Sequence, residues 1–486
     1  MKEYAAKQPS PWVSVLPLAV LTLLLYVVIR CFGGDAINGG SQIALLSATS
    51  VCVMLAIGIY RCKWAVLEEA IIDNIRASAS AIIILLLIGA IAGSWMVSGV
   101  VPTMIYYGLK ILHPSFFLVA SCAICAGVSL MTGSSWTTIA TIGVALMGIG
   151  QAMGFPEGWI AGAIISGAYF GDKISLLSDT TVLASSTVGV PIFTHIRYML
   201  YTTVPSFVIA LAVFVIAGLT LDHTGGTHAG MYAESLRGTF RITPWLLAVP
   251  VATGVLIVRK LPAIVTLFCA AVFACIAMLL AQPELVAKVA GVGGLDFMSG
   301  FKGVLMSCFG PTAIPTGSPQ LDELVATRGM AGMLNTVWLI ICAMCFGGVM
   351  TGSGMLGALT SVFLCFVRRA FSAVASTVGA GIFFNLCTAD QYISIILSGR
   401  LFRELYAEQG LEPRLLSRSV EDSATVCSVL VPWNSCGMTQ ATVLGVSTFV
   451  YMPYCIFNIV SPLMSLAVAA IGWKIKRAAG SAAHPH

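Results

Sequence analysis

Five acidic residues stand apart from the other acids of this sequence because apolar or small residues flank each of them. They are Asp172, Asp179, Asp390, Glu421 and Asp422. An ionised carboxylate at membrane depth costs about 2.5–3.5 kcal/mol, so each of the five needs a proton, a metal cation, a basic neighbour or water. A carboxylate that holds either a proton or a cation binds the two in competition. That competition is the minimum chemistry for exchanging one against the other.

Hydroxyl side chains follow two of these acids. Asp179 precedes Thr180–Thr181, and Asp422 is followed by Ser423 and Thr425. A hard cation such as Na+ prefers several oxygens, which carboxylates, hydroxyls and the carbonyls of a broken helix supply. The expected ion- and proton-binding residues are Asp172, Asp179, Thr180, Thr181, Asp390, Glu421, Asp422 and Thr425. We expect Na+ at Asp179, Thr180 and Asp422; the alternative is that the two acids cap helix N-termini at membrane-interface turns.

Polar islands interrupt the apolar sequence at three further places, residues 132–138, 385–392 and 433–437. They are typical of unwound helix midpoints whose free backbone groups face a cavity, and a tight turn outside the membrane is the alternative. The candidate cavity residues are Ser134, Ser135, Trp136, Thr137, Asn385, Thr388, Trp433 and Asn434. The first island has no charge and the second has Asp390, which suggests a separate task for this acid, such as proton carriage or charge balance.

Two other titratable side chains lie close to these acids in the sequence. Lys173 directly follows Asp172, and we interpret it as half of a local ion pair at a helix end. The alternative is that its ammonium occupies the empty cation site and leaves when a cation enters. His195, two residues before Arg197, is either a pH sensor or a structural residue at the membrane interface.

The composition indicates which solvent surrounds these residues. Of 486 residues, 58% are hydrophobic and 9% are charged, and the mean hydropathy is +0.95, whereas soluble domains are about a quarter charged. Lipid must therefore surround most of the chain. The net charge of +5 without a basic cluster argues against nucleic acid. Without a Walker loop, a Gly-x-Ser-x-Gly elbow or a His-Glu-x-x-His pair, we expect neither an enzyme nor a cofactor.

A membrane span needs about 20 apolar residues, and several runs meet or approach this length. They are 12–31, 42–60, 79–99, 115–130, 136–153, 159–170, 196–219, 244–259, 262–281, 334–352, 373–388, 391–403, 423–434 and 441–472. Because Gly, Pro or a charge interrupts some of them, we expect an all-α polytopic membrane protein with about 12 transmembrane helices plus re-entrant pieces. Basic residues after the second and last runs, with Lys2 and Lys7, place both termini in the cytoplasm.

The two halves of the chain look related. Residues 93–99, 132–136 and 178–181 are matched in the same order by 348–354, 385–390 and 421–425. Such internal symmetry with interrupted helices is the best pointer in a sequence to a transporter's binding site, and we expect inverted repeats with re-entrant hairpins and broken helices. The expected parts are a two-span segment with an amphipathic connector (1–78), a first repeat with scaffold helices (79–282), a Pro/Gly-rich hinge (283–330), a second repeat with the last span (331–472) and a basic tail (473–486).

Longer motifs carry a family resemblance. Residues 132–147, 166–173, 177–181 and 194–196 resemble segments of the NhaC-type Na+/H+ antiporter family, and so do residues 416–418, 421–422, 432–437 and 444–445. The resemblance implies exchange of Na+ for H+ in a bacterial inner membrane. The family also includes malate–lactate exchangers, in which a dicarboxylate moves with protons against Na+ and a monocarboxylate. Related ion-transporter folds imply a scaffold part and a moving transport part, in a homodimer.

Two departures from the family pattern lie beside Asp179. Leu176 replaces a proline and Val182 replaces an asparagine, which removes an amide that could ligate the solute. We therefore expect a Na+/H+ antiporter, with a Na+- or H+-coupled exchanger of small organic anions or amino acids as the alternative. The expected partners are lipid, Na+, H+ and, in the second case, a small carboxylate or amino acid.

Overall fold

The computed structural model describes residues 9–32, 39–221, 227–259, 261–294, 296–317, 322, 325–365, 367 and 369–475. All regular elements in these ranges are helices. Eight of them are long and apolar enough to cross a membrane, and up to eleven if each of three bent pairs counts as one span. The all-helical, multi-pass class is therefore confirmed, whereas twelve spans stay a prediction. Lys2, Lys7 and most of the basic tail lie outside the described residues.

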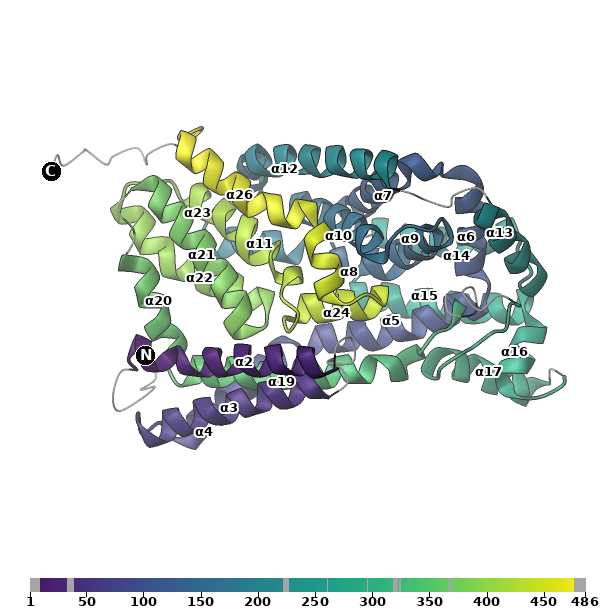
Figure 1. The fold of residues 1–486 in the computed structure, drawn as a ribbon, viewed down its shortest axis with the longest axis horizontal. Helices are drawn as coiled ribbons and strands as arrows, with labels where there is room; N and C mark the ends of the chain where they lie inside the picture. Colours follow the sequence, from purple (N-terminus) through teal and green to yellow (C-terminus); the bar gives the residue numbers. More distant parts are fainter. Residues whose placement is uncertain are drawn as a thin grey trace.

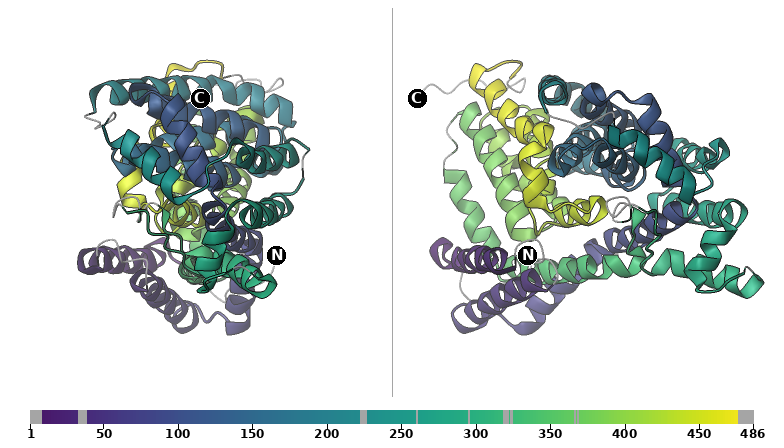
Figure 2. Two further views of the ribbon diagram at one scale, coloured as in Figure 1. Left: turned by 90° about the vertical axis from the view of Figure 1, so that its right-hand side faces the viewer. Right: turned by 45° about the vertical axis from the view of Figure 1, so that its right-hand side comes forward.

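The helices surround a central region of the molecule. Figure 1 shows α2, α3, α4 and α19 along one edge of the molecule and α12 along the opposite edge. Helices α20, α21, α22 and α23 gather at one end, and α13, α16 and α17 lie at the other. Figure 2 shows the yellow C-terminal helices beside the blue and teal helices of the first half, and α26 packs against α10 and α12. Residues from both halves of the sequence therefore meet in the middle of the fold, around α8, α10, α11 and α24.

The chain begins with helices that pack against the second half. They are α1 (Pro11–Ser14), α2 (Leu16–Phe32), α3 (Gly40–Gly58) and α4 (Trp64–Ala77). The first half continues through α5 (Ala79–Val97), α6 (Val100–Ile111), α7 (Phe117–Thr132), α8 (Ser135–Thr138), the π-helical turn η3 (Ile139–Gly143), α9 (Val144–Ala152), α10 (Glu157–Ile174) and α11 (Asp179–Val188). Next come α12 (Ile192–Thr220), α13 (Thr227–Thr239), α14 (Ala248–Val258) and α15 (Ala263–Ala281).

The second half of the chain is again built from helices. It contains α19 (Gly329–Gly352), α20 (Met355–Cys365), α21 (Ala370–Thr388), α22 (Gln391–Glu408), α23 (Pro413–Val420), the π-helical turn η5 (Glu421–Thr425), α24 (Ser435–Leu444), α25 (Thr448–Tyr451) and α26 (Ile456–Ile471). The apolar run 423–434 is not a transmembrane helix. It contains the π turn, a short 3-10 turn η6 (Ser428–Leu430) and Pro432, which cannot donate a backbone hydrogen bond.

The segment between the halves is more ordered than its Pro and Gly content suggests. It begins with α16 (Pro283–Ala290) and α17 (Phe297–Phe309), and only the part after Gly310 is non-helical up to residue 317. Thr312 and Thr327 pair their backbones in an isolated antiparallel bridge. Ser318 and Pro319 lie outside the described residues.

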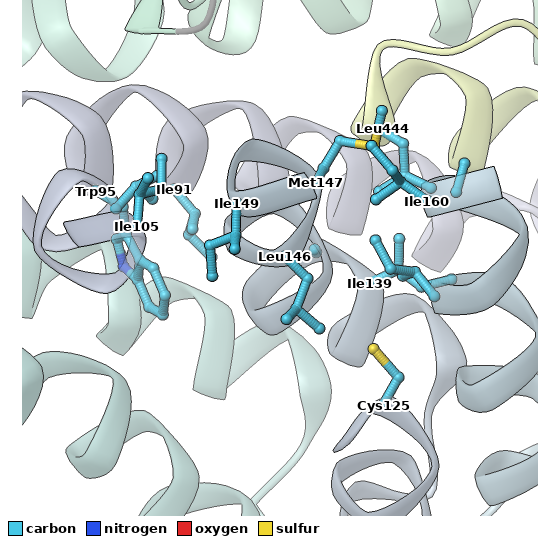
Figure 3. Close-up of a cluster of buried hydrophobic side chains, with 14 of the residues drawn as sticks. Ile91, Trp95, Ile105, Cys125, Ile139, Leu146, Met147, Ile149, Ile160 and Leu444 are labelled. Carbon is cyan, nitrogen blue, oxygen red and sulfur yellow. The ribbon is translucent and has the colours of Figure 1, made fainter. Parts of the chain in front are cut away.

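Small residues allow close packing between α7 and α10. A Cβ on Gly167 would come within 2.0 Å of the Cys122 carbonyl oxygen, and one on Gly171 within 2.2 Å of the Ala126 carbonyl. Around this contact lies the largest apolar cluster of the protein. Figure 3 shows part of it, with labelled side chains from α5, α6, α7, η3, α9, α10 and α24. The tight packing fixes the position of the C-terminal end of α10, where Asp172 and Lys173 lie.

Candidate functional site

Two breaks in the helices lie in the central region. The first break, residues 175–178, separates α10 from α11, whose axes differ by 47°. The second break, residues 426–434, separates η5 from α24. Each following helix is capped by a side chain at the end of its break, because the Ser178 hydroxyl accepts from the Thr181 N–H and the Asn434 amide oxygen accepts from the Cys436 N–H.

Each break is faced by a helix pair with a tight turn. We call α7 with α8 the first helix pair and α21 with α22 the second. In each turn one residue has a left-handed backbone, Gly133 with a φ of 66° and Ala389 with a φ of 56°. The next residue caps the following helix, Ser134 in the first pair and Asp390 in the second. The polar islands around residues 132–138 and 385–392 therefore contain the turns between the two helices of each pair, and an unwound helix midpoint facing a cavity stays a prediction.

Contacts of the first half recur in the second half between residues that lie the same number of positions further along the chain. Ser129 Oγ donates to the Ala168 carbonyl at 2.6 Å, and its counterpart Asn385 Nδ2 donates to the Ala424 carbonyl at 2.7 Å. The same separation relates Thr132 to Thr388, Ser134 to Asp390 and Ser178 to Asn434. It corrects the expected match of residues 178–181 with 421–425, since the structural counterpart of Ser178 is Asn434. Residues 178–181 and 421–425 are alike in polarity but do not occupy corresponding positions in the two halves.

The equivalent positions carry different charges. In the first half the Ser135 N–H and hydroxyl donate to Asp172 Oδ2 at 3.1 and 2.7 Å. At the same place in the second half the Ser428 hydroxyl donates to Gln391 Oε1 at 2.9 Å. Asp172 is thus held by the first helix pair and does not pair with Lys173. The expected local ion pair between these two neighbours is wrong.

Lys173 instead pairs with an acid from the other half of the chain. Its Nζ contacts Asp422 Oδ1, and both side chains are completely buried. Two hydroxyls share the contact: Ser461 Oγ lies 2.9 Å from Nζ, and Thr202 Oγ1 lies 3.1 Å from Asp422 Oδ1. The pair therefore joins α10, η5, α12 and α26. Asp422 lies inside a continuous helical segment, so it is not an N-cap.

Arg418 approaches the second oxygen of Asp422. Its Nε is 3.8 Å from Asp422 Oδ2, and its guanidinium lies 4.9 Å from the ring centroid of Tyr198. The side chain is fully buried, yet none of its three guanidinium nitrogens has a hydrogen-bond partner in the part of the chain that the structure describes. Buried polar atoms normally have a partner, so this guanidinium is an exception within the described part of the chain.

Glu421 completes what we call the buried charge cluster, consisting of Lys173, Arg418, Glu421 and Asp422. Its Oε1 accepts from the Thr180 hydroxyl at 3.4 Å, and its Oε2 has no hydrogen-bond partner within the described ranges. Close by, the Thr181 hydroxyl donates to the Lys173 carbonyl at 3.0 Å, while Thr425 Oγ1 is another buried atom for which the described residues provide no partner.

His195 lies near this cluster on α12. It is fully buried, its Nδ1 is 2.9 Å from Ser417 Oγ, and its Nε2 has no partner among the described residues. Asp179, by contrast, is exposed at the start of α11, and Val182 and Leu176 are also exposed. The structure brings Glu421 and Asp422 together with Lys173, and it places Asp179 outside the cluster.

The remaining predicted residues line the two helix pairs and the second break. Thr137 donates its hydroxyl to Ser134 Oγ at 3.1 Å, and the adjacent Trp136 is half-buried. Asp390 is buried, its Oδ1 accepts from the Ile393 N–H at 3.0 Å, and its Oδ2 lies 3.4 Å from Ser435 Oγ. Trp433 Nε1 donates to the Leu386 carbonyl at 2.8 Å. These contacts hold the second helix pair against the second break.

Sequence reasoning missed three residues of the site. Arg418 lies four residues before Asp422 on one helical face, a spacing that favours contact, and this signal was available. Thr202 and Ser461 lie in long apolar helices, where a lone hydroxyl commonly bonds its own backbone. Their role depends on which helices pack together, and no local pattern shows that.

Known proteins resemble this chain over most of its length. Residues 167–473 match the Na+/H+ antiporter family. The chain is 35% identical to the Na+/H+ antiporter NhaC of Alkalihalophilus pseudofirmus, over 87% of this chain and 89% of the relative. It is also 35% identical to a malate-2H+/Na+-lactate antiporter of Bacillus subtilis, over 89% of this chain and 88% of the relative.

A third relative widens the range of transported solutes in the group. It is the arginine/ornithine antiporter ArcD of Halobacterium salinarum, which is 34% identical over 96% of this chain and 93% of the relative. All three relatives are antiporters by name, and this chain has eight helices long and apolar enough to cross a membrane among its described residues. The chain is therefore a secondary antiporter rather than an enzyme, and it belongs to the Na+/H+ antiporter family.

Proposed function

We propose that this antiporter exchanges Na+ for H+ and that the buried ion pair of Lys173 and Asp422 marks its cation site. The observation that carries the proposal is the full burial of this pair among the hydroxyls of Thr202 and Ser461. A carboxylate with hydroxyl neighbours is a ligand set that suits Na+. The ammonium of Lys173 holds the place of the cation, so Na+ binds only when the ammonium leaves.

The ion pair also suits a site that must not stay empty. Removing one partner of a buried pair leaves an uncompensated charge in a low-dielectric interior, at a cost of about 3–5 kcal/mol. Arg418 lies 3.8 Å from Asp422 Oδ2, so Oδ1 is the oxygen that needs a close cation, either the lysine ammonium or Na+. This requirement couples the arrival of Na+ to a change in the protonation or position of a neighbouring group.

Fluorescence of a pH-sensitive dye in everted membrane vesicles tests the proposal. Addition of Na+ to respiring vesicles should collapse part of the pH gradient when the wild-type chain is present, and the Asp422→Asn variant should give no response. Glu404→Gln is the matched control, because Glu404 is exposed on α22 and should behave as wild type. A full Na+ response from the D422N variant would refute the assigned site.

One observation favours a second candidate function. The guanidinium of Arg418 is buried and without hydrogen-bond partners among the described residues, and such a group binds a carboxylate in two-pronged fashion. Exchange of a small carboxylate or amino acid, as the names of two relatives indicate for those proteins, would use it. Uptake of a labelled carboxylate or amino acid without any Na+ response in the vesicles would favour this function over the first.

The finer architecture belongs to the same proposal. We infer two repeats of inverted topology, re-entrant helix pairs, about twelve spans in a bacterial inner membrane and both termini in the cytoplasm. The recurring contacts between each helix pair and its break support the repeat. A homodimer with a fixed scaffold part and a moving transport part follows from the resemblance alone, and cross-linking in native membranes tests it.

A further inference from the structure

Two cysteines on neighbouring helices lie in contact, and neither helix contains a member of the buried charge cluster. Cys275 is on α15 and Cys308 is on α17, and their sulfurs are 3.5 Å apart although 33 positions separate them in the sequence. Each side chain is only partly buried. The sulfurs of a disulfide are about 2.0 Å apart, so a small rotation of the two side chains brings these sulfurs within bonding distance.

Helix α5 fixes the positions of both cysteine-bearing helices. Trp95 Nε1 on α5 donates to the Ala270 carbonyl of α15 at 3.3 Å. A Cβ on Gly93 of α5 would come within 1.9 Å of the Ser307 carbonyl oxygen of α17, so the glycine permits the close approach of these two helices. Both contacts lie close to the cysteine of the same helix. The two sulfurs therefore meet because α15 and α17 pack against one common helix.

Water reaches the end of α17 that carries Cys308. The helix ends at Phe309, and residues 311–317 are non-helical, with positions 311, 313, 315 and 317 exposed. Irregular backbone does not occur in contact with the hydrocarbon of a bilayer, because its polar groups would have no hydrogen-bond partners there. The exposed part of this segment therefore faces water. Cys308 directly precedes the last residue of α17, so a small water-soluble oxidant has access to its thiol.

We propose that Cys275 and Cys308 form an oxidation site at which hydrogen peroxide produces a disulfide. The Cys308 thiol gives its proton to water, and the resulting thiolate attacks one peroxide oxygen. The O–O bond breaks, a sulfenic acid forms on Cys308, and the other oxygen takes up a proton and leaves as water. The Cys275 sulfur then attacks the Cys308 sulfur, the S–O bond breaks, and a second water leaves with the Cys275 proton. The two thiols lose two electrons in total, and these electrons reduce the peroxide to water.

The disulfide connects two helices that already pack on the same neighbour. It closes a loop of the chain that contains α16, and such a cross-link lowers the entropy of the unfolded chain. Oxidation should therefore stabilise the fold. Neither cysteine belongs to the cation site, so the oxidation site is independent of which ions the protein exchanges.

Cleavage of the chain between the two cysteines tests the site. A protease recognition sequence is inserted between Gly293 and Gly294, which are exposed and belong to a short connection of small residues that should tolerate it. The full chain is treated with hydrogen peroxide in native membranes, the remaining thiols are blocked with N-ethylmaleimide, and the protease is added. On a gel without reductant the chain should stay as one band, and a reductant should separate it into two fragments.

Three single variants of this chain complete the experiment. Cys275→Ser and Cys308→Ser should each separate into two fragments without reductant. Cys269→Ser is the matched control, because Cys269 is another partly buried thiol of α15, and it should stay as one band. Separation of the oxidised parent chain, or a single band from C275S, would overturn the assignment. If one of the two serine variants does not fold, the other gives the same readout.

Thermal unfolding measures the consequence of the bond. Peroxide treatment should raise the midpoint of the wild-type protein by about 3 °C, and dithiothreitol should reverse the shift. The same treatment should leave the midpoint of C275S unchanged. A bridged protein whose midpoint does not rise would overturn the stabilising role of the disulfide.

Discussion

The two breaks of this protein have the same backbone contacts and different charges. At the first, Asp172 accepts two hydrogen bonds from Ser135 of the facing helix pair. At the second, the corresponding hydrogen bond runs from Ser428 to Gln391, between neutral groups. The carboxylate of the second half lies instead on the turn of its helix pair, at Asp390. The two breaks therefore have similar contacts with their helix pairs, and they differ in where the charged side chains lie.

The difference is largest at the buried ion pair. The counterpart of Lys173 in the second half is Val429, and the counterpart of Asp422 in the first half is Ser166, whose hydroxyl accepts from the Phe457 N–H at 3.3 Å. Within the described ranges one ion pair thus forms between the halves, where full symmetry would give two. A site that both halves build, and that neither contains alone, can respond when one half moves relative to the other.

Replacing Lys173 by its counterpart is expected to have the largest effect. Lys173→Val removes the closer of the two cations beside Asp422 and leaves Arg418 at 3.8 Å as the remaining one, which should lower the free energy of unfolding by about 3 kcal/mol and abolish exchange. Equilibrium unfolding in mixed micelles and the vesicle assay measure the two effects.

The triple variant K173V/R418M/D422S provides the control for that experiment, because removing Asp422 alone would leave the buried Arg418 without its acid. It replaces the paired charges by uncharged side chains, so it should regain most of the lost stability and remain unable to transport. If the triple variant were as unstable as K173V, the unpaired charge of Asp422 would not be the cause of the destabilisation.

The turns of the two helix pairs offer the second test. Gly133 and Ala389 both have a left-handed backbone, but a Cβ on Gly133 would come within 2.6 Å of the Leu177 carbonyl carbon. Gly133→Ala should therefore cost about 2–3 kcal/mol of stability through strain and overlap. Ala389→Gly should be neutral or slightly stabilising, because glycine adopts this backbone readily. Equal losses in the two variants would show that the turns are not matched as described.

Much of this architecture could be predicted because it depends on local patterns. Apolar runs, the polar islands around residues 134 and 390, and Pro432 before Asn434 mark the helices and their interruptions directly in the sequence. Pairing across the fold could not be predicted in the same way. The partner of Lys173 is Asp422, a residue of the opposite half. The sequence around Lys173 gives no reason to pair it with Asp422 rather than with the adjacent Asp172.

The hydrogen bonds at the two breaks allow a finer comparison. Ser135→Ala removes the hydroxyl that donates to Asp172 at 2.7 Å and leaves the backbone N–H in place. Because hydrogen bonds to charged groups are stronger than those between neutral groups, we expect S135A to cost about 1 kcal/mol of stability and Ser428→Ala to cost less. Thermal unfolding of both variants in one detergent compares them. A larger loss in S428A would mean that the Asp172 contact does not involve an ionised acid.

The smallest effect is expected at Asp179, one of the two acids at which the sequence predicts Na+ binding. Asp179 is exposed in the first turn of α11, where a negative charge gains only the weak, solvent-screened attraction of a helix N-terminus. Asp179→Asn should therefore keep the apparent KM for Na+ within about twofold of wild type. Asp422→Asn should abolish the response in the same vesicles. If D179N also lost transport, the cation would have to contact the first break during the cycle, and the ion pair of Lys173 and Asp422 would be only one stage of its path.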